Sequence, residues 1–159
     1  MSKHKNKNLS AVEMRLSAAG YALPDSAPPI ANYQAAVRHG NQVVTAGQLP
    51  MAAGSLLHTG LVGVDLDAEQ ARACVRQATL NALSAVRTCV DLADVKQTIR
   101  LVGYLACPAT FTEHPEILNA GSDLLFTAFG EHGNHVRSAV GVSSLPLGSP
   151  VEIELVVGV

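Results

Sequence analysis

Three charged residues near the end of the chain are the strongest candidates for chemistry. The closing stretch, HVRSAVGVSSLPLGSPVEIELVVGV (residues 135–159), contains two apolar runs joined by a Pro/Gly turn, which predicts a hairpin of two strands. Arg137 stands at the start of the first run, and Glu152 and Glu154 lie inside the second. Strand alternation places both glutamates on one face of the second strand. Two carboxylates on an otherwise apolar strand indicate a functional or ion-paired site.

Arg137 has two interpretations at this point. A guanidinium is a planar fork of donors that suits a carboxylate ligand, and the small residues Ser138 and Ala139 leave room beside it. Alternatively, Arg137 forms a structural ion pair with Glu152 or Glu154, because buried arginines are usually paired. One glutamate could then pair with a cation while the other orients a water molecule or a proton. The spacing leaves these alternatives open.

No other motif in the sequence points to a known type of site. The chain has no G-x-G-x-x-G, no G-x-x-x-x-G-K-[ST] and no G-x-S-x-G, so nothing indicates a dinucleotide, a P-loop nucleotide or a serine nucleophile. His132 and His135 lie in a glycine-rich turn, which we expect to be a solvated loop rather than a zinc site. Cys74, Cys89 and Cys107 are unclustered, which favours free thiols in a reducing cytosol. We therefore predict no metal and no organic cofactor.

The composition is that of one apolar globular domain. The 159 residues are 48% hydrophobic and 15% charged, and the net charge is −2. The absence of a basic face argues against nucleic acid as a partner. The basic cluster Lys3, Lys5 and Lys7 belongs to residues 1–9, which we expect to form a disordered tail. The sequence shows no signal peptide and no apolar run of about 20 residues, so we expect a cytoplasmic protein without a membrane span.

Capping residues and apolar spacing predict three helices within a single domain, residues 10–159. Ser10 and Glu13 form a capping signal in an N-terminal helical extension, residues 10–24. Asp67 begins a long amphipathic helix, and another runs from Pro115 to Gly130. Strands are expected on both sides of a turn at His39, Gly40 and Asn41, within residues 55–63, over residues 95–105, and in the closing stretch. In the strand over residues 95–105, alternation places Ile99 toward the core and Thr98 and Arg100 on the other side.

This order of elements predicts an α+β fold in which a mixed sheet carries two helices on one face. The chain has no elements left to cover the other face of the sheet, and its apolar fraction is high. Association of several copies of the chain is the simplest way to bury that face.

Four stretches of the sequence resemble the Rid (YjgF-type) family of imine and enamine deaminases, also labelled the endoribonuclease L-PSP family. They are ANYQAAVRHGNQVVTAGQLP, the long helix before DVKQTIRLVGYL, LNAGSDLLFTAFGEHG, and VRSAVGVSSLPLGSPVEIELVV. The last stretch is the most specific, because its Arg-Ser, Leu-Pro turn and Val-Glu-Ile-Glu strand have the family's spacing. The resemblance runs from about Pro29 to Val159. EMRLSAAGYALP and NAGSD are similar to a longer-chain branch of the family.

The resemblance implies a chorismate-mutase-like fold and a homotrimer, with the sheets forming an inner barrel and three clefts between subunits. Arg137 matches the arginine that binds the substrate carboxylate, and Glu152 matches the glutamate that positions the attacking water. Tyr33, Asn119 and the backbone at Gly47 match residues that line the cleft.

The remaining positions of the implied substrate site are Ala46, Ser138 and Ala139. Ala46 and Ala139 depart from the family pattern, which often has serine and cysteine there. The implied reaction is hydrolysis of 2-imino or enamino acids to 2-oxo acids and ammonia, as in 2-iminobutanoate and 2-iminopropanoate deaminases, without a metal or cofactor. Two alternatives remain: a non-catalytic trimer that binds a carboxylate metabolite as a regulator or sensor, and an endoribonuclease or translation inhibitor, which the mild acidity of the chain disfavours.

Overall fold

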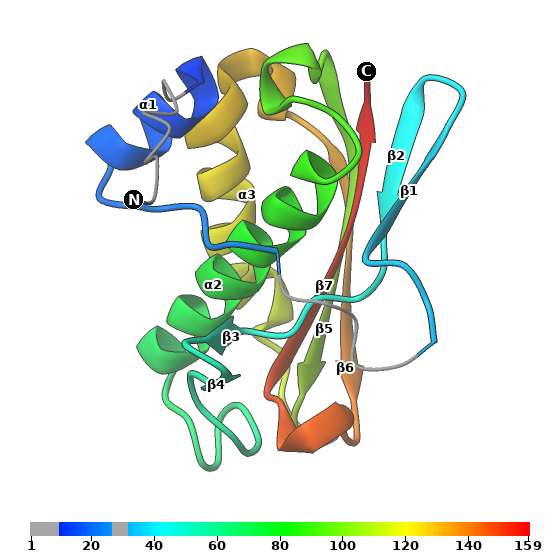
Figure 1. Ribbon diagram of the computed structural model, residues 1–159. Coiled ribbons are helices and arrows are strands. Elements are labelled where there is room, and N and C mark those ends of the chain that lie inside the picture. The colour runs from blue at the N-terminus through cyan, green and yellow to red at the C-terminus, as the bar shows by residue number, and fades with distance from the viewer. Residues whose placement is uncertain (1–9, 27–31) are drawn as a thin grey trace, which may run out of the picture.

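The computed structural model describes residues 10–26 and 32–159, and it shows three helices on one side of a five-stranded sheet (Figure 1). The predicted tail lies outside the described residues. The helices are α1 (Ala11–Ala18), α2 (Ala68–Arg87) and α3 (His114–Phe129), and the sheet contains β1 (Ala36–His39), β2 (Gln42–Thr45), β5 (Gln97–Ala106), β6 (Val136–Val142) and β7 (Val151–Gly158). A separate small pair is formed by β3 (Met51–Ala52) and β4 (Ser55–Leu56), and the short 3-10 helices are η1 (Leu92–Asp94), η2 (Gly130–Gly133) and η3 (Pro146–Gly148).

The predicted helix ends are confirmed. Ser10 caps α1 and Asp67 caps α2, and in each case the residue three positions on, Glu13 or Gln70, bonds back to the cap. These reciprocal bonds satisfy amide groups that have no partner in the first turn of a helix. Gly130 ends α3 with a φ of 60°, which glycine adopts without strain. Local sequence therefore determines where these helices begin and end.

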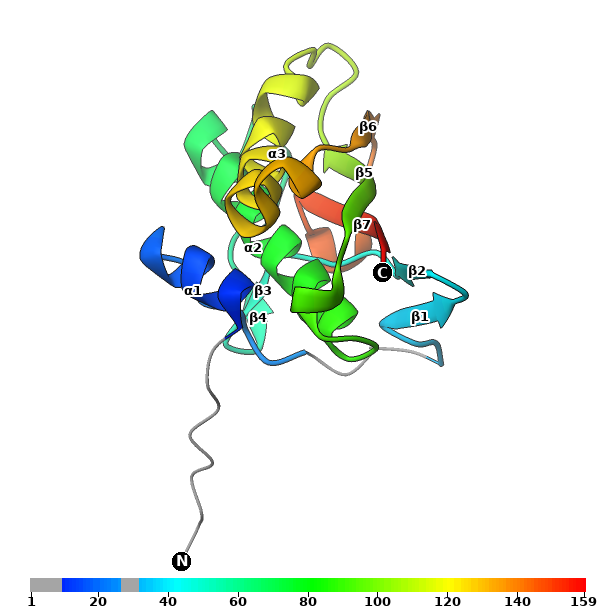
Figure 2. The same cartoon turned by 90° about the horizontal axis from the view of Figure 1, so that it is seen from above.

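The hydrophobic core lies between the sheet and two helices. α2 and α3 both pack against the same face of the sheet, while α1 packs outside them on α3 (Figure 2). β7 alternates strictly, and Val151, Ile153, Leu155 and Val157 are fully buried against the helices. The predicted α+β fold, with a mixed sheet covered by helices on one face, is confirmed.

The prediction that the closing stretch forms a hairpin is wrong. The strand order is β1-β2-β7-β5-β6, so β5 lies between β6 and β7. β6 runs parallel to β5 because α3 connects them as a crossover, and β7 pairs antiparallel with the other edge of β5. The Pro/Gly segment that contains η3 therefore crosses the end of β5 instead of joining neighbouring strands.

Two further strand predictions need correction. Thr98 is buried on the helix side of the sheet, because the register between β5 and β7 shifts between Thr98 and Arg100. The shift leaves Ile99 half-buried, whereas unbroken alternation would have placed it in the core. Within residues 55–63, only Ser55–Leu56 is a strand.

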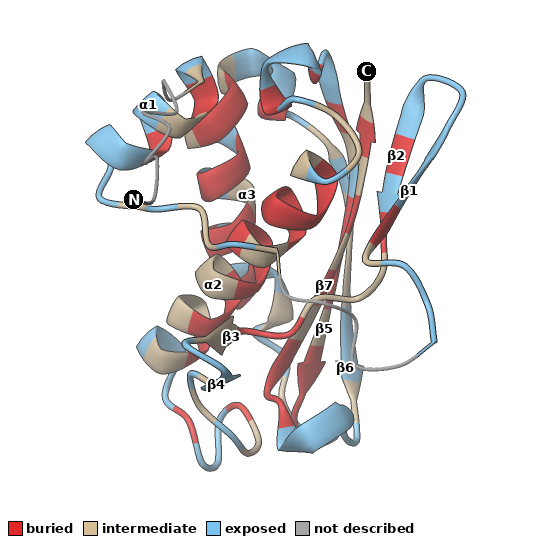
Figure 3. Cartoon of the chain, viewed as in Figure 1, coloured by how far each residue is buried: buried red, intermediate tan, exposed pale blue. Residues whose placement is uncertain are grey.

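The other face of the sheet is open in the described part of the chain (Figure 3). Val44 on β2 is 45% exposed and Val140 on the edge strand β6 is 38% exposed, which is high for apolar side chains. A hollow of about 460 Å³ on this face is lined by Val44, Thr45, Arg100, Val102, Tyr104, Ser138, Val140, Glu154 and Val156. The open face thus combines apolar surface with a few charged and hydroxyl groups.

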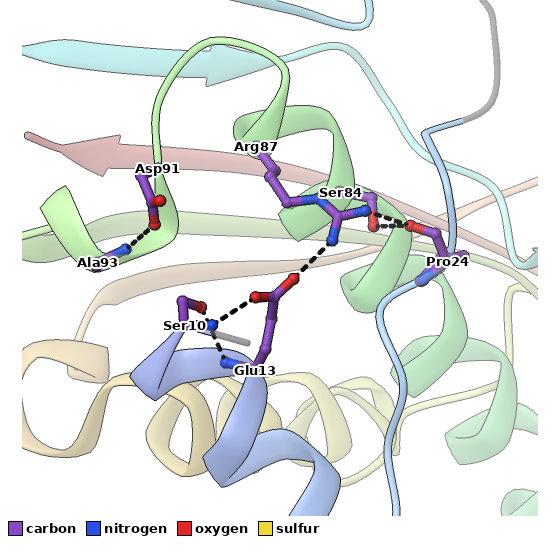
Figure 4. Close-up of polar contacts among 7 residues, drawn as sticks. All are labelled: Ser10, Glu13, Pro24, Ser84, Arg87, Asp91 and Ala93. Carbon is purple, nitrogen blue, oxygen red and sulfur yellow. Dashed lines mark hydrogen bonds and ion pairs between the residues drawn. The ribbon is translucent and has the colours of Figure 1, made fainter. Parts of the chain in front are cut away.

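The N-terminal extension is joined to α2 by one arginine (Figure 4). Nη1 of Arg87 donates to Oε1 of Glu13 at 2.8 Å, and Nη2 donates to the carbonyl oxygen of Pro24 at 3.1 Å. Ser84 Oγ donates to the same carbonyl at 2.7 Å. The backbone N–H of Ser10 is the main cause that lowers the pKa of Glu13 from its ordinary value, with Arg87 contributing. Glu13 is therefore a carboxylate that both caps α1 and pairs with α2.

We expect Arg87→Met to lower the Tm by about 3–8 °C, because it removes two hydrogen bonds to partly buried acceptors. Arg76→Met is the matched control, since Arg76 lies on the same helix and pairs with the exposed Glu69; its Tm should change by no more than about 2 °C. Thermal unfolding, with hydrogen exchange of residues 10–24, measures both effects. Equal stability of the two variants would contradict the anchoring role of Arg87.

Candidate active site

Helix α3 holds the guanidinium of Arg137 through neutral acceptors. Nη1 of Arg137 lies 3.0 Å from Oδ1 of Asn119 and 3.0 Å from Oγ of Ser122, and Nη2 lies 3.2 Å from the carbonyl oxygen of Pro115. These acceptors are spaced four and three residues apart, so they share one face of the helix. The structure thus brings Arg137 and Asn119 together, as the resemblance implies.

The alternative of an ion pair between Arg137 and Glu152 or Glu154 is wrong within one subunit. Arg137 lies opposite Leu101 in the sheet register, on the face that the helices cover. Glu152 lies opposite Tyr104 and projects from the open face. The sheet therefore separates the arginine from both carboxylates, and none of the ion pairs in the described residues contains Arg137.

The hydrogen bonds of Arg137 leave part of its guanidinium free. A guanidinium has five N–H donors, and three of them point to Asn119, Ser122 and Pro115. The Nε donor and one Nη2 donor have no acceptor among the described residues. These two donors are on neighbouring nitrogens, which is the arrangement that a carboxylate needs for a bidentate contact.

A glycine in β5 allows α3 to approach the sheet. A Cβ at Gly103 would lie 3.0 Å from Cγ of Leu118 and closer still to its methyl groups. A side chain at Gly103 would require the fully buried side chain of Leu118 to shift. The small residue in β5 thus permits close packing between the sheet and the helix that bonds Arg137.

Glu152 sits against the backbone of the loop that follows β2. A Cβ at Gly47 would overlap the carboxyl group of Glu152 and lie 2.6 Å from its Cδ. Two backbone hydrogen bonds, of 2.8 and 2.9 Å, join Gln48 to Ile153 and hold this loop beside β7. Burial, followed by the negative charge of Glu154, raises the pKa of Glu152. A half-buried carboxyl group with a raised pKa suits proton transfer.

The second glutamate of β7 has a different partner. The hydroxyl of Tyr104 donates to Oε2 of Glu154 at 3.4 Å, and burial, with Glu154 contributing, raises the pKa of Tyr104. Nearby, Nη2 of Arg100 donates to Oγ of Ser138 at 3.2 Å. Ser138 therefore faces the open side of the sheet, away from the guanidinium of Arg137, although the two residues are neighbours in the chain.

The remaining predicted site residues are Ala139, Ala46 and Tyr33. Ala139 lies on the helix side of β6, two residues beyond Arg137 and half-buried. Ala46 precedes Gly47, and its N–H donates to the carbonyl of Ala35 at 2.8 Å. Tyr33 lies before β1 and is 46% exposed. Arg137 and Glu152 thus lie on opposite faces of the sheet.

Sequence reasoning missed Ser122 and misjudged His135. Ser122 is a polar residue three positions after Asn119 on the same face of α3, and that spacing is the signal that could have identified it. His135 lies in the loop between η2 and β6, but it is half-buried rather than fully solvated, and its Nε2 lies 3.0 Å from Oγ of Ser122. Both residues extend the group of side chains around Arg137.

The described residues contain no group of three metal-ligating side chains, and Cys74, Cys89 and Cys107 are free thiols. No helix in the described ranges is both long and apolar enough to cross a membrane.

Comparison with known proteins places the chain in context. Residues 13–158 match the model of the family described as YjgF/chorismate mutase-like, putative endoribonuclease. Protein TCP17 of Trypanosoma cruzi is 35% identical over 148 residues, which cover 92% of each chain. The family match confirms the predicted chorismate-mutase-like fold.

Two solved structures are similar in both sequence and fold. The Agrobacterium tumefaciens protein Atu1372, of unknown function, is 36% identical with a TM-score of 0.86, covering 93% of this chain and 91% of that one. A putative endoribonuclease from Shewanella oneidensis is 36% identical with a TM-score of 0.90, covering 94% and 100%. Both matches cover more than nine tenths of this chain.

We expect Glu152→Gln to raise the Tm at pH 7 by about 1–3 °C. The folded protein raises the pKa of this carboxyl above its ordinary 4.5, so its ionised form is less favourable in the folded chain than in the unfolded one. That penalty is present at neutral pH and disappears once the pH falls below about 4.5, where both states are protonated. Thermal unfolding from pH 3 to pH 8 tests this dependence.

Glu69→Gln is the control for that series, because Glu69 is exposed and its pKa is lowered by Arg76. It should give no gain in Tm at any pH. A loss of stability at pH 7 in Glu152→Gln would show that the carboxylate is stabilised by the fold, contrary to this account.

Proposed function

We propose that this chain, which belongs to the YjgF/chorismate mutase-like family, hydrolyses reactive 2-imino acids, or their enamine tautomers, to 2-oxo acids and ammonia. Such substrates carry a carboxylate next to an electrophilic imine carbon. The observation that carries the proposal is the guanidinium of Arg137, which α3 holds with two neighbouring donors free. This group is suited to bind the carboxylate and to fix the imine carbon beside it.

Glu152 supplies the other chemical role in this proposal. Its carboxylate holds a water molecule and takes a proton from it as the water oxygen bonds to the imine carbon. Glu152 delivers this proton to the former imine nitrogen, which gives a carbinolamine with a hydroxyl and an amino group on the same carbon. Glu152 then takes the proton of that hydroxyl group and passes it to the amino nitrogen, the C–N bond breaks, and ammonia leaves as the 2-oxo group forms. The raised pKa of Glu152 brings it closer to the range in which it can both accept and return a proton.

The proposal requires two copies of the chain at each site. The sheet separates Arg137 from Glu152 within one subunit, so neither can serve a substrate bound by the other there. We propose a homotrimer in which Arg137 of one subunit meets Glu152 of the next. The open face of the sheet supports this assembly, since it exposes Val44 and Val140 and is uncovered in the described part of the chain.

The alanines at Ala46 and Ala139 bear on substrate choice. Both positions often have a polar residue in the family, and Ala139 lies on the same face of β6 as Arg137. The site is therefore expected to be roomier and less polar, and to accept imines derived from leucine or methionine over the small imine derived from serine.

Turnover of 2-imino acids, generated in the assay from the amino acids by an oxidase, tests the function. Arg137→Ala should abolish ammonia release and remain folded, and Arg137→Lys should also be poor, because an ammonium cannot form the bidentate contact. Glu152→Gln should lower kcat by about 10²–10⁴-fold while carboxylate affinity changes little. Arg72→Ala and Glu69→Gln, at the exposed start of α2, are controls that should keep wild-type turnover.

The outcomes separate this function from its alternatives. If a folded Arg137→Ala variant keeps wild-type turnover, Arg137 does not bind the substrate carboxylate. Binding of 2-oxo acids without turnover of any imine would favour a non-catalytic regulator or sensor, which the same arginine could serve. Salt-sensitive RNA cleavage that is lost in Glu152→Gln would favour the endoribonuclease activity suggested by the name of the Shewanella oneidensis relative.

A further inference from the structure

Arg137 is one end of a chain of hydrogen bonds that reaches the backbone of η2. Nη1 of Arg137 lies 3.0 Å from Oγ of Ser122, and that oxygen lies 3.0 Å from Nε2 of His135. Nδ1 of His135 lies 2.6 Å from the carbonyl oxygen of Gly133. Three side chains and one carbonyl are therefore linked in series.

The chemistry of these groups determines the direction of every bond. A carbonyl oxygen can only accept, so Nδ1 of His135 must carry the hydrogen that bonds to Gly133. In the neutral ring, Nε2 is then an acceptor, and Ser122 must donate its hydroxyl hydrogen to it. The lone pairs of Ser122 Oγ are left to accept from Arg137, which has only donors. Each group fixes the orientation of the next.

The chain is attached to a rigid point. Gly133 is buried, and a Cβ there would lie 2.8 Å from Cα of Phe126, so the backbone of η2 is in direct contact with α3. Its carbonyl is therefore held in a fixed place relative to the helix that carries Ser122. His135 lies only two residues before Arg137, so the imidazole and the guanidinium belong to the same short segment of the backbone.

Ser122 differs from two threonines that lie inside the same pair of helices, α2 and α3. A serine or threonine inside a helix usually donates to the carbonyl four residues earlier. Thr79 does so with Val75 at 2.8 Å, and Thr127 does so with Asp123 at 2.9 Å. Ser122 has His135 as its partner instead. The imidazole thus diverts this hydroxyl from the helix backbone and turns its oxygen toward Arg137.

We propose that His135 is a positioning residue for the carboxylate-binding arginine, and that it acts through Ser122. The inference rests on the proposed function, because it assigns a role within the Arg137 site. His135 does not touch the substrate. It holds Ser122 so that Nη1 of Arg137 stays bonded to α3, which keeps the Nε and Nη2 donors directed at the ligand. Without it, Ser122 donates to its own helix and Arg137 loses one of its fixed contacts.

The first experiment reads the tautomer of His135 directly, and it does not depend on activity. A two-bond ¹H–¹⁵N spectrum of the intact protein distinguishes Nδ1–H from Nε2–H in each neutral imidazole. The geometry predicts the Nδ1–H form for His135. His132, which is exposed, serves as the reference in the same spectrum. An Nε2–H tautomer for His135 would overturn the proposed series of bonds.

The second experiment measures the affinity for 2-oxobutanoate by calorimetry. His135→Leu and Ser122→Ala should each raise the Kd about fivefold to tenfold, roughly the effect of losing one hydrogen bond. The double variant should bind no more weakly than Ser122→Ala alone, because His135 acts through Ser122. His135→Gln, whose side-chain oxygen can still accept from Ser122, should restore most of the affinity. His132→Leu is the matched control and should bind like the wild type.

A purely structural role for His135 gives a different pattern. In that case His135→Leu lowers the Tm but leaves the Kd unchanged, or its effect on Kd adds fully to that of Ser122→Ala; either result would overturn the proposal. In turnover, the positioning role predicts a higher KM with little change in kcat. Should His135→Leu fail to fold, Ser122→Ala and His135→Gln still decide the question.

Failure of the proposed function can be recognised separately. If Arg137→Ala binds 2-oxobutanoate as the wild type does, the arginine does not bind carboxylates and the function itself is refuted. If Arg137→Ala loses binding while Ser122→Ala and His135→Leu keep it, the function stands and the positioning role of His135 is refuted.

Discussion

The alternation of side chains in the sheet is the constraint on which the account depends. β7 has to bury every second residue against α2, so its glutamates can only project from the opposite face. Arg137 lies on the helix face, because its register partner in β5 is the fully buried Leu101. No rotation of side chains within one subunit can bring these groups together. The fold therefore separates the two groups, and this separation is the reason why the proposed site is shared between two copies of the chain.

The environment of Arg137 indicates why it is available for a ligand. Its partners are an amide oxygen, a hydroxyl and a backbone carbonyl, and none of these carries a charge. A carboxylate partner would have cancelled the positive charge of the guanidinium. Neutral acceptors fix its position and leave its charge to an incoming anion. The close approach of α3 at Gly103 and the bond from Ser122 to His135 both contribute to this position.

Arg137 and Glu152 also differ in their surroundings. Arg137 donates three hydrogen bonds to neutral acceptors. Burial and the neighbouring Glu154 both raise the pKa of Glu152. A destabilised carboxyl group is often retained where function requires it. The contact between Glu152 and Gly47 explains why a residue without a side chain is needed beside it.

Features that depend on neighbours in the chain could be predicted from the sequence. The caps at Ser10 and Asp67 and the face shared by Glu152 and Glu154 follow from local spacing, and the structure has them. Features that depend on distant contacts could not. The closing stretch was expected to be a hairpin because nothing local shows that β5 lies between its strands. The burial of Thr98 follows from a register shift that only strand pairing reveals.

The candidate site also combines residues that the sequence indicates with residues whose roles depend on distant contacts. The charge pattern of the closing stretch indicates Arg137 and Glu152 as candidates, and the resemblance to a family adds Asn119, which the structure places on the arginine. Ser122 and His135 were not candidates, because their role arises only where α3, η2 and β6 meet. The separation of Arg137 from Glu152 required the strand register, since both residues belong to one short stretch of sequence.

One measurement tests the shared site most directly. Arg137→Ala and Glu152→Gln subunits, each inactive alone, are unfolded together in equal amounts and refolded, and mixed assembly is verified by native mass spectrometry. If each site takes Arg137 from one subunit and Glu152 from the next, every mixed trimer regains one intact site. The mixture should then recover about a quarter of wild-type imine turnover, as random assembly of a cyclic trimer gives. Mixed trimers that remain as inactive as the separate variants would contradict the account.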